Sequence, residues 1–196
     1  MKTKLLYILP FLGLFACEDI SEQPIEKEPK EDVAQSESKY LKEGKTIAKT
    51  TFKVLSSNLK NAMAEGGIEN ALSYCNVNAM PLTDSLSNHY NVSIKRVSDK
   101  ARNSLNTPTE SEQKIIDDYL ANIENRKPVL VKNEEGNPTF YAPIVAKSLC
   151  LSCHGIVGES LLPENHEKIK LLYPEDKAIG YKEGDLRGIW SIEFKN

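Results

Sequence analysis

The run Cys150-Leu151-Ser152-Cys153-His154 constrains this chain more than any other feature of its sequence. In a helical turn, residues three positions apart lie on one face, so the two thiols can reach neighbouring vinyl groups on one edge of a porphyrin. The adjacent imidazole of His154 is then placed to bind the iron. This spacing is typical of the covalent attachment of a c-type haem.

Two other functions of a Cys-x-x-Cys pair are weaker alternatives. A thioredoxin-like dithiol is expected at the start of a helix within a βαβ pattern, and the sequence shows no such pattern. A zinc site needs four ligands, and the chain offers no second Cys-x-x-Cys and no His-x₃₋₅-His pair. We therefore expect one covalently bound haem c, attached through Cys150 and Cys153, with His154 on the iron.

The first sixteen residues form a targeting segment. Lys2 and Lys4 precede an apolar stretch from Leu5 to Phe15, which is too short to span a bilayer and fits the core of a signal peptide. Leu14-Phe15-Ala16-Cys17 resembles the lipobox of bacterial lipoproteins, which implies cleavage before Cys17 and lipidation of its thiol. The alternative is an ordinary signal peptide in which Cys17 is a chance residue. Either peptide directs the chain out of the cytoplasm, and the covalent attachment of c-type haem also takes place outside the cytoplasm.

Three segments are expected, with residues 1–16 as the signal peptide. Residues 17–39 contain few apolar side chains and are predicted to be a disordered acidic tether, because they cannot bury enough surface to offset the entropy of ordering. Residues 40–196 then form one domain of ordinary length. We expect this domain to be lipid-anchored to a bacterial membrane, on its periplasmic side or at the cell surface. The formal net charge of −3 argues against a nucleic-acid partner.

The pattern of apolar residues predicts helices first and antiparallel strands later, which is an α+β domain. The expected helices cover approximately residues 38–64, 68–86 and 110–123, with a short one after Pro163. The first should end at Gly66-Gly67, and Pro81 should kink or restart the second. The expected strands cover residues 92–97, 129–131, 139–141 and 189–194, and the middle two form a hairpin. Thr109 and Glu112 have the spacing of a capping box.

The second ligand of the iron would set its reduction potential and its access to other molecules. The candidates are His89, His166, Met63, Met80 and Cys75. Both histidines also fit exposed positions, and Met63 fits the apolar face of a helix. Met80 would give an electron-transfer cytochrome of raised potential. Cys75 has no disulfide partner once the other three thiols are modified, and a free thiol outside the cytoplasm must be buried or coordinated. A small buried apolar residue is its alternative role.

Several short motifs resemble one bacterial family. They are Ala71-Leu72-Ser73-Tyr74-Cys75, Arg102-Asn103 with Asn106 and Pro108, Tyr141-Ala142-Pro143, Cys150 to Gly155, Tyr173 to Tyr181, and Gly184-Asp185-Leu186-Arg187-Gly188. The family comprises c-type haem proteins with a PAS-like fold, among them a cyanobacterial monohaem cytochrome and periplasmic sensing domains. The resemblance covers residues 40–196 in the same order. Ser104 is a departure, because the family commonly has proline directly after Arg-Asn.

The resemblance implies a PAS-like antiparallel sheet flanked by N-terminal helices and a haem iron bound by His154 and Cys75. A thiolate stabilises ferric iron, so this pair implies a low reduction potential. Independently of the resemblance, Arg96, Arg102 and Arg187 are candidates for contacts with the haem propionates, because a planar guanidinium matches a carboxylate. Surface or fold-stabilising roles are the alternative for each arginine.

These features favour a lipid-anchored monohaem protein that senses redox state or a diatomic gas. The sequence contains no kinase, cyclase or DNA-binding motif, so a signal would pass to a separate redox or signalling protein. The alternative is a periplasmic electron-transfer cytochrome c. An enzyme is not expected, because a peroxidase needs an open iron site and a distal acid–base residue, and the sequence commits to neither.

Overall fold

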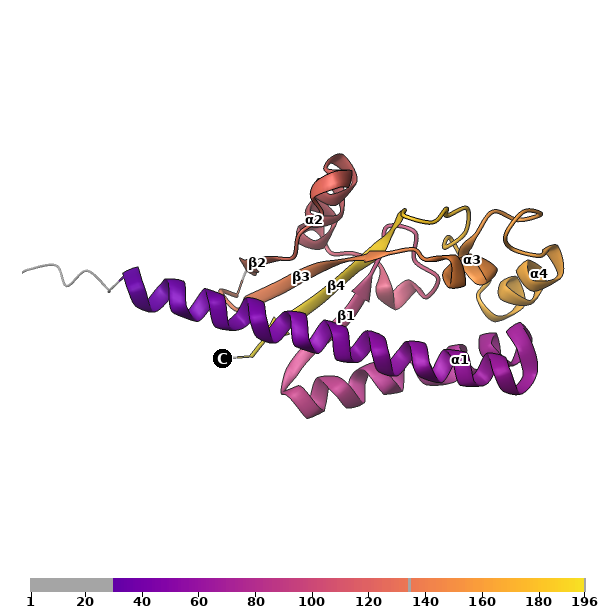
Figure 1. Cartoon of the computed structure of the whole chain (residues 1–196), viewed down its shortest axis with the longest axis horizontal. Coiled ribbons are helices and arrows are strands. Elements are labelled where there is room, and N and C mark those ends of the chain that lie inside the picture. Colours follow the sequence, from indigo (N-terminus) through magenta and orange to yellow (C-terminus); the bar gives the residue numbers. More distant parts are fainter. Residues whose placement is uncertain (1–29, 134, 196) are drawn as a thin grey trace, which may run out of the picture.

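Residues 30–133 and 135–195 are described by a computed structural model of the chain (Figure 1). Its helices are α1 (Lys30–Tyr90), α2 (Glu110–Ala121), α3 (Ser148–His154) and α4 (Pro163–Leu172). Its strands are β1 (Val92–Val97), β2 (Val129–Lys132), β3 (Pro138–Val145) and β4 (Leu186–Phe194). The predicted α+β class, an antiparallel sheet flanked by N-terminal helices, is confirmed, and so is the predicted hairpin.

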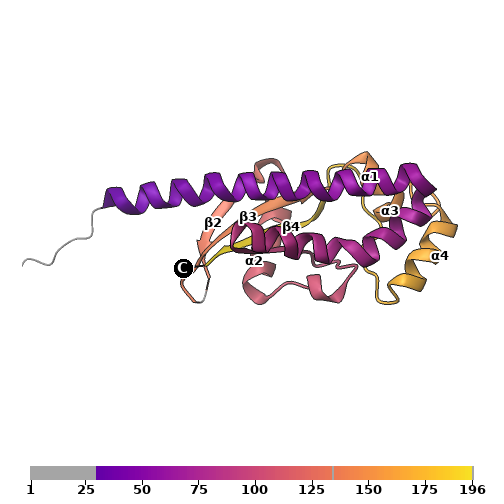
Figure 2. The same ribbon diagram turned by 90° about the horizontal axis from the view of Figure 1, so that it is seen from below.

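Helix α1 consists of two arms joined at Gly66 and Gly67, where the backbone angles are not helical. Gly67 has a φ of 68°, in the left-handed region that glycine adopts without a steric penalty. Across this turn the side-chain amide of Asn70 donates a hydrogen bond of 2.8 Å to the carbonyl of Ala62. The first arm therefore ends at the two glycines, as predicted, and the second arm folds back beside it (Figure 2).

Helix α1 begins earlier than predicted and is continuous at Pro81. Helix α1 begins at Lys30 rather than near Ser38, so residues 30–39 are helical and not part of a disordered tether. Once the packed part of a helix is nucleated, each further residue extends it at little cost. The helix also continues through Pro81, so this proline does not start a new helix. Residues 1–29, which include Cys17, lie outside the described residues.

The sheet separates two layers of helix. Its strand order is β1-β4-β3-β2, and every neighbouring pair is antiparallel. Successive side chains of a strand point to opposite faces. The face toward α1 carries Ile94, Phe140, Ala142, Trp190, Ile192 and Phe194. The face toward α2 carries Val97, Tyr141 and Ile189, which pack against Ile116 and Tyr119. Two separate cores thus hold the sheet between α1 and α2.

Two local features fix these helices on the sheet. At Gly44 of α1 a Cβ atom would overlap the ring of Phe140, so glycine allows the helix to approach β3 closely. Helix α2 begins with the predicted capping box: Glu112 N donates to Thr109 Oγ1 at 3.3 Å, and Thr109 N donates to Glu112 Oε2 at 3.0 Å. The predicted start of α2 is therefore confirmed.

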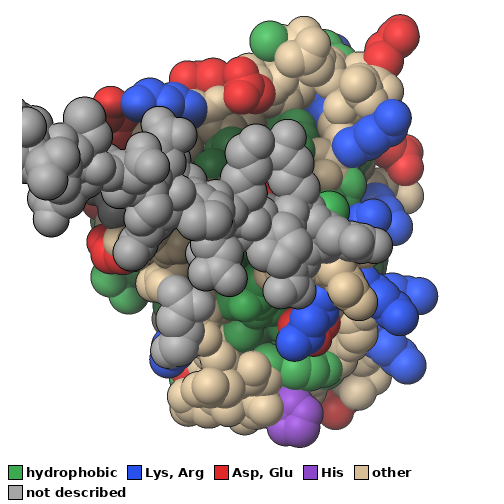
Figure 3. Space-filling model, turned by 90° about the vertical axis from the view of Figure 1, so that its left-hand side faces the viewer, with side chains coloured by type: hydrophobic (Ala, Val, Ile, Leu, Met, Phe, Trp, Pro, Cys, Tyr) green, Lys and Arg blue, Asp and Glu red, His purple; other side chains and the backbone are tan. Residues whose placement is uncertain are grey.

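The two ends of the molecule differ in character. Helices α3 and α4 lie at one end, beside the turn of α1, and the hairpin loop lies at the other (Figure 1). The hairpin end shows Lys and Arg side chains gathered along one side and hydrophobic side chains near its centre (Figure 3).

Within residues 30–133 and 135–195, no helix has an apolar stretch long enough to cross a membrane.

Candidate functional site

Helix α3 carries the Cys-x-x-Cys-His motif, which confirms that its residues lie in a helical turn. The segment after α4 is bound to this helix by two backbone hydrogen bonds. Gly180 N donates to the carbonyl of Gly155 at 2.9 Å, and Tyr181 N donates to the carbonyl of His154 at 3.0 Å. Cys153 packs against the apolar cluster around Leu72 and Ile169, so α3 is also fixed to α1 and α4.

The imidazole of His154 is oriented by the same segment. Its Nδ1 atom lies 2.7 Å from the backbone carbonyl of Ala178. Because a carbonyl only accepts hydrogen bonds, Nδ1 carries the proton and Nε2 keeps a free lone pair. Burial lowers the pKa of His154 well below its usual value, and Arg187 and Arg102 lower it further, so the ring is neutral. A neutral imidazole held by a carbonyl in this way is the usual form of a metal-binding histidine.

Two adjoining cavities, of about 220 and 240 Å³, lie between α1, the sheet and α3. The larger one is lined by the two attachment cysteines, the two iron ligands that the resemblance implies and the three candidate arginines: Cys75, Arg96, Arg102, Cys150, Cys153, His154 and Arg187. The smaller one is lined by the same residues except Cys153, together with apolar side chains such as Leu55 and Trp190. The fold therefore brings together residues that are up to 112 positions apart in the sequence (75 and 187).

Three of the five candidates for the second ligand reach this site. Cys75 lies on the second arm of α1 and lines both cavities, and Met63 and Met80 line the larger one. His89 is exposed at the end of α1, and His166 on α4 lines neither cavity. Burial raises the pKa of the Cys75 thiol, although Arg96 and Arg102 oppose this shift.

No group of three or more His, Cys, Asp or Glu side chains in residues 30–133 and 135–195 could hold a metal ion directly. Cys75, Cys150 and Cys153 are free thiols, so none of these three is in a disulfide. The zinc alternative therefore finds no set of ligands in this part of the chain.

Arg102 is bound within the protein. Its Nε and terminal nitrogen lie 3.2 Å from the two carboxylate oxygens of Asp176, and the terminal nitrogen also donates to the carbonyl of Cys153 at 2.6 Å. The side chains of this ion pair are 12% and 2% exposed. Asp176 Oδ1 also accepts a hydrogen bond of 2.9 Å from Ala178 N. Arg102 therefore fixes the segment that orients His154, which is the fold-stabilising role left open for it.

Arg96 and Arg187 are different, because neither has a carboxylate partner in the described part of the chain. Arg96 donates one long hydrogen bond, of 3.5 Å, to the carbonyl of Ala79. Arg187 donates one of 3.4 Å to the carbonyl of Lys100, and its buried Nε has no partner among the described atoms. Burial lowers the pKa of both arginines. Two half-buried cations without a carboxylate partner suit a cavity that takes an anionic ligand.

Sequence reasoning missed three contributors to the site. Ala178 acts through its backbone carbonyl, and no side-chain pattern reveals such a role. Asp176 lies within the motif from Tyr173 to Tyr181, but its pairing with Arg102 spans 74 positions. Trp190 lies opposite both Arg96 and Ala142 in the strand register, so β4 places its indole between them on the α1 face.

Comparison with known proteins agrees with this geometry. The crystal structure of the cyanobacterial heme-protein Tll0287 is similar, with a TM-score of 0.57 and 20% sequence identity, over 79% of this chain and 96% of that one. This likeness shows a shared fold. No curated protein matches the chain. The family model described as Tll0287-like matches residues 26–194, which is most of the sequence. The resemblance seen in the short motifs is thus confirmed, and the chain belongs to the Tll0287-like family.

Proposed function

We propose that this protein carries one haem c, bound covalently through Cys150 and Cys153, with His154 and Cys75 as the two ligands of the iron. One observation carries the proposal: Cys75 from α1 and the three motif residues from α3 line the same cavity. The similar structure of a cyanobacterial heme-protein supports it. The haem would supply the electron transfer and the binding of small ligands.

The residues of the cavity fit such a group. Because Nδ1 of His154 donates its proton to the carbonyl of Ala178, Nε2 stays free to bind a metal. The half-buried guanidiniums of Arg96 and Arg187 are matched to carboxylates such as the two propionates of a haem. Leu55, Leu59 and other apolar side chains form the remaining walls, which suit the face of a porphyrin.

The two iron ligands would determine the reduction potential of the haem and whether it can bind a gas. A thiolate from Cys75 would stabilise ferric iron and give a low reduction potential. If His154 and Cys75 both held the iron, a gas would be able to bind only after Cys75 had been displaced. Cys75 lies on the second arm of α1, which leads directly into β1, so its release would act on the sheet. This connection favours a redox or diatomic-gas sensor that passes its signal to a separate protein.

The ligands are tested by spectroscopy of the matured protein. Cys75→Ser should change the ferric optical and EPR spectra and raise the reduction potential, because a thiolate is lost. Met80→Leu and Met63→Leu are matched controls from the same cavity and should leave the spectra unchanged. If Cys75→Ser leaves the spectra unchanged while Met80→Leu alters them, Met80 is the ligand and the proposal is wrong.

Reduced protein exposed to carbon monoxide and nitric oxide separates the two functions. Binding of either gas on reduction, with loss of the thiolate spectrum, is expected of a sensor. A reversible redox couple with no gas binding would instead identify an electron-transfer cytochrome c. Rapid turnover of peroxide would contradict both and indicate an enzyme.

We further propose that a lipid on Cys17 anchors the protein to a bacterial membrane, on the periplasmic side or at the cell surface. The motif from Leu14 to Cys17 supports this proposal. Mass spectrometry of the N-terminal peptide should find a diacylated Cys17 and no residues before it. Cys17→Ser should move the protein from the membrane fraction to the soluble fraction, whereas an unmodified Cys17 in the native protein would refute the anchor.

A further inference from the structure

A third cavity, of about 330 Å³, lies between the first arm of α1 and β3, apart from the residues proposed to hold the haem. Most of the residues that line it are apolar. They include Ala48 and Phe52 from α1, and Phe140, Ala142 and Ile144 from β3. Phe52 is 42% exposed, so an aromatic ring stands at the mouth of the cavity and not in the packed core. A small apolar group that entered this space would move part of its surface out of water.

Three lysines line the same cavity. Lys45 and Lys49 lie on successive turns of one face of α1, and Lys147 comes from the residue before α3. The ammonium of Lys147 lies 5.6 Å from the centre of the Phe52 ring, so it lies beside the mouth. No acidic side chain lines the cavity, and none of the three lysines has an ion-pair partner among the described residues. The apolar space is therefore bordered by three uncompensated positive charges.

We propose that this cavity binds a small anionic amphiphile, namely a monocarboxylate with a hydrocarbon body. The apolar walls would hold the hydrocarbon, and Lys45, Lys49 and Lys147 would hold the carboxylate. A cationic amphiphile would be repelled by the lysines, and a small polar anion would gain nothing from the walls. The single acyl chain of a free fatty acid is the occupant we choose, because a cavity of about 330 Å³ is too small for a phospholipid with two chains.

This cavity shares a wall with the smaller of the two cavities proposed for the haem. Phe52, Ile144 and Trp190 line both. One layer of side chains therefore separates the proposed carboxylate site from the proposed haem site. An occupant that moves Trp190 would also move the side chain opposite to it in the register, that of Arg96. This coupling rests on the proposed haem site, whereas the binding of a carboxylate does not.

The probe is octanoate, titrated calorimetrically into the full-length protein at low ionic strength, with octylammonium and acetate as comparison ligands. One octanoate should bind, and binding should weaken as salt is added. Octylammonium and acetate should bind at least tenfold more weakly. Equal binding of octanoate and octylammonium would refute the proposal, as would the absence of octanoate binding at millimolar concentration. Binding to anionic phospholipid vesicles without any binding of octanoate would point to a bilayer instead, which also overturns the proposal.

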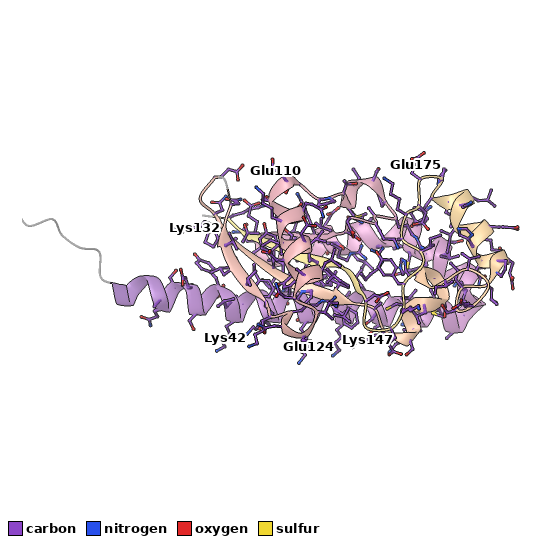
Figure 4. All side chains as sticks on the ribbon, turned by 90° about the horizontal axis from the view of Figure 1, so that it is seen from above. Lys42, Glu110, Glu124, Lys132, Lys147 and Glu175 are labelled. Atoms are coloured by element: carbon purple, nitrogen blue, oxygen red, sulfur yellow. The ribbon has the colours of Figure 1, made fainter. Side chains whose placement is uncertain are left out.

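Charge-reversal variants locate the site. Lys45→Glu with Lys49→Glu should weaken octanoate binding by about tenfold or more, because two attractive charges become repulsive. Lys60→Glu with Lys132→Glu makes the same change of net charge outside the cavity, and Lys132 lies well away from Lys147 (Figure 4). This control pair should weaken binding less than twofold. Equal effects of the two pairs would refute the site, and circular dichroism of both verifies that they fold.

A shift of the haem absorption on adding octanoate tests the coupling separately. If the protein carries no haem, or its iron is not bound by Cys75, the calorimetric result still stands. If octanoate does not bind, the ligation experiments on Cys75 are unaffected. The two proposals can therefore fail independently.

Discussion

Removing the negative charge of Asp176 tests how the site is held. Asp176 is 2% exposed on its side chain and faces the guanidinium of Arg102, which is 12% exposed. It accepts two hydrogen bonds of 3.2 Å from Arg102 and one of 2.9 Å from Ala178 N. Asp176→Asn keeps the shape of the side chain. It turns one acceptor into a donor that faces a guanidinium, and it leaves that guanidinium without a counter-ion.

The expected cost follows from this burial. Breaking a buried ion pair from one side leaves an uncompensated charge and costs about 3–5 kcal/mol. An exposed pair within a helix provides the matched control. Lys114 and Glu110 lie 3.1 Å apart on α2 with side chains 72% and 86% exposed, so Glu110→Gln should cost less than about 0.5 kcal/mol. Both substitutions remove one negative charge, so their difference measures burial and not net charge.

The assay is urea denaturation of the full chain, followed by far-ultraviolet circular dichroism and analysed by linear extrapolation. The Asp176→Asn variant should lose several kcal/mol of unfolding free energy, and the double variant with Arg102→Gln should lose less than the sum of the two single variants. A loss below about 1 kcal/mol, or one equal to that of Glu110→Gln, would refute the reasoning. In that case the segment that orients His154 would not depend on this ion pair.

Three further predictions use the same denaturation assay. Thr109→Ala removes half of the capping box and should cost about 1 kcal/mol, so unchanged stability would contradict the role of the cap. Gly44→Ala should cost about 1–3 kcal/mol despite the better helix propensity of alanine, because its Cβ overlaps the Phe140 ring; a more stable variant would contradict this packing. Burial raises the pKa of Tyr119 to about 12, against about 10 when unfolded, so the fold favours the protonated phenol. The stability from this group is complete below pH 10 and is lost as the pH rises toward 12, and Tyr119→Phe should remove this part of the decline.

Local patterns were sufficient to predict most elements of the fold. The two glycines at 66 and 67 end a helical arm, and the Thr109 cap begins α2, because both effects act within a few residues. The beginning of α1 at Lys30 could not be predicted in this way. The residues before Ser38 have no apolar stripe of their own, and they extend a helix that is stabilised by packing farther along the chain.

Only those parts of the candidate site that consist of a recognisable side-chain motif could be predicted from the sequence. The Cys-x-x-Cys-His spacing and the thiol of Cys75 single out residues that the fold brings to one cavity. The carbonyl of Ala178 and the pairing of Asp176 with Arg102 depend on how the segment after α4 folds over α3. Such contacts arise from tertiary structure and leave no local pattern in the sequence.

The length of the first arm of α1 has a mechanical consequence. An unbroken helix from Lys30 to Glu65 is about 54 Å long, and a helix transmits displacement along its axis far better than a coil does. Beyond its far end, next to the Gly66-Gly67 turn, Glu69 is bound at 2.6 Å to Lys168 of α4, which packs beside the motif helix. A displacement applied at Lys30 would therefore reach the opposite end of the molecule, so the arm can work as a lever between its own N-terminal end and the candidate site.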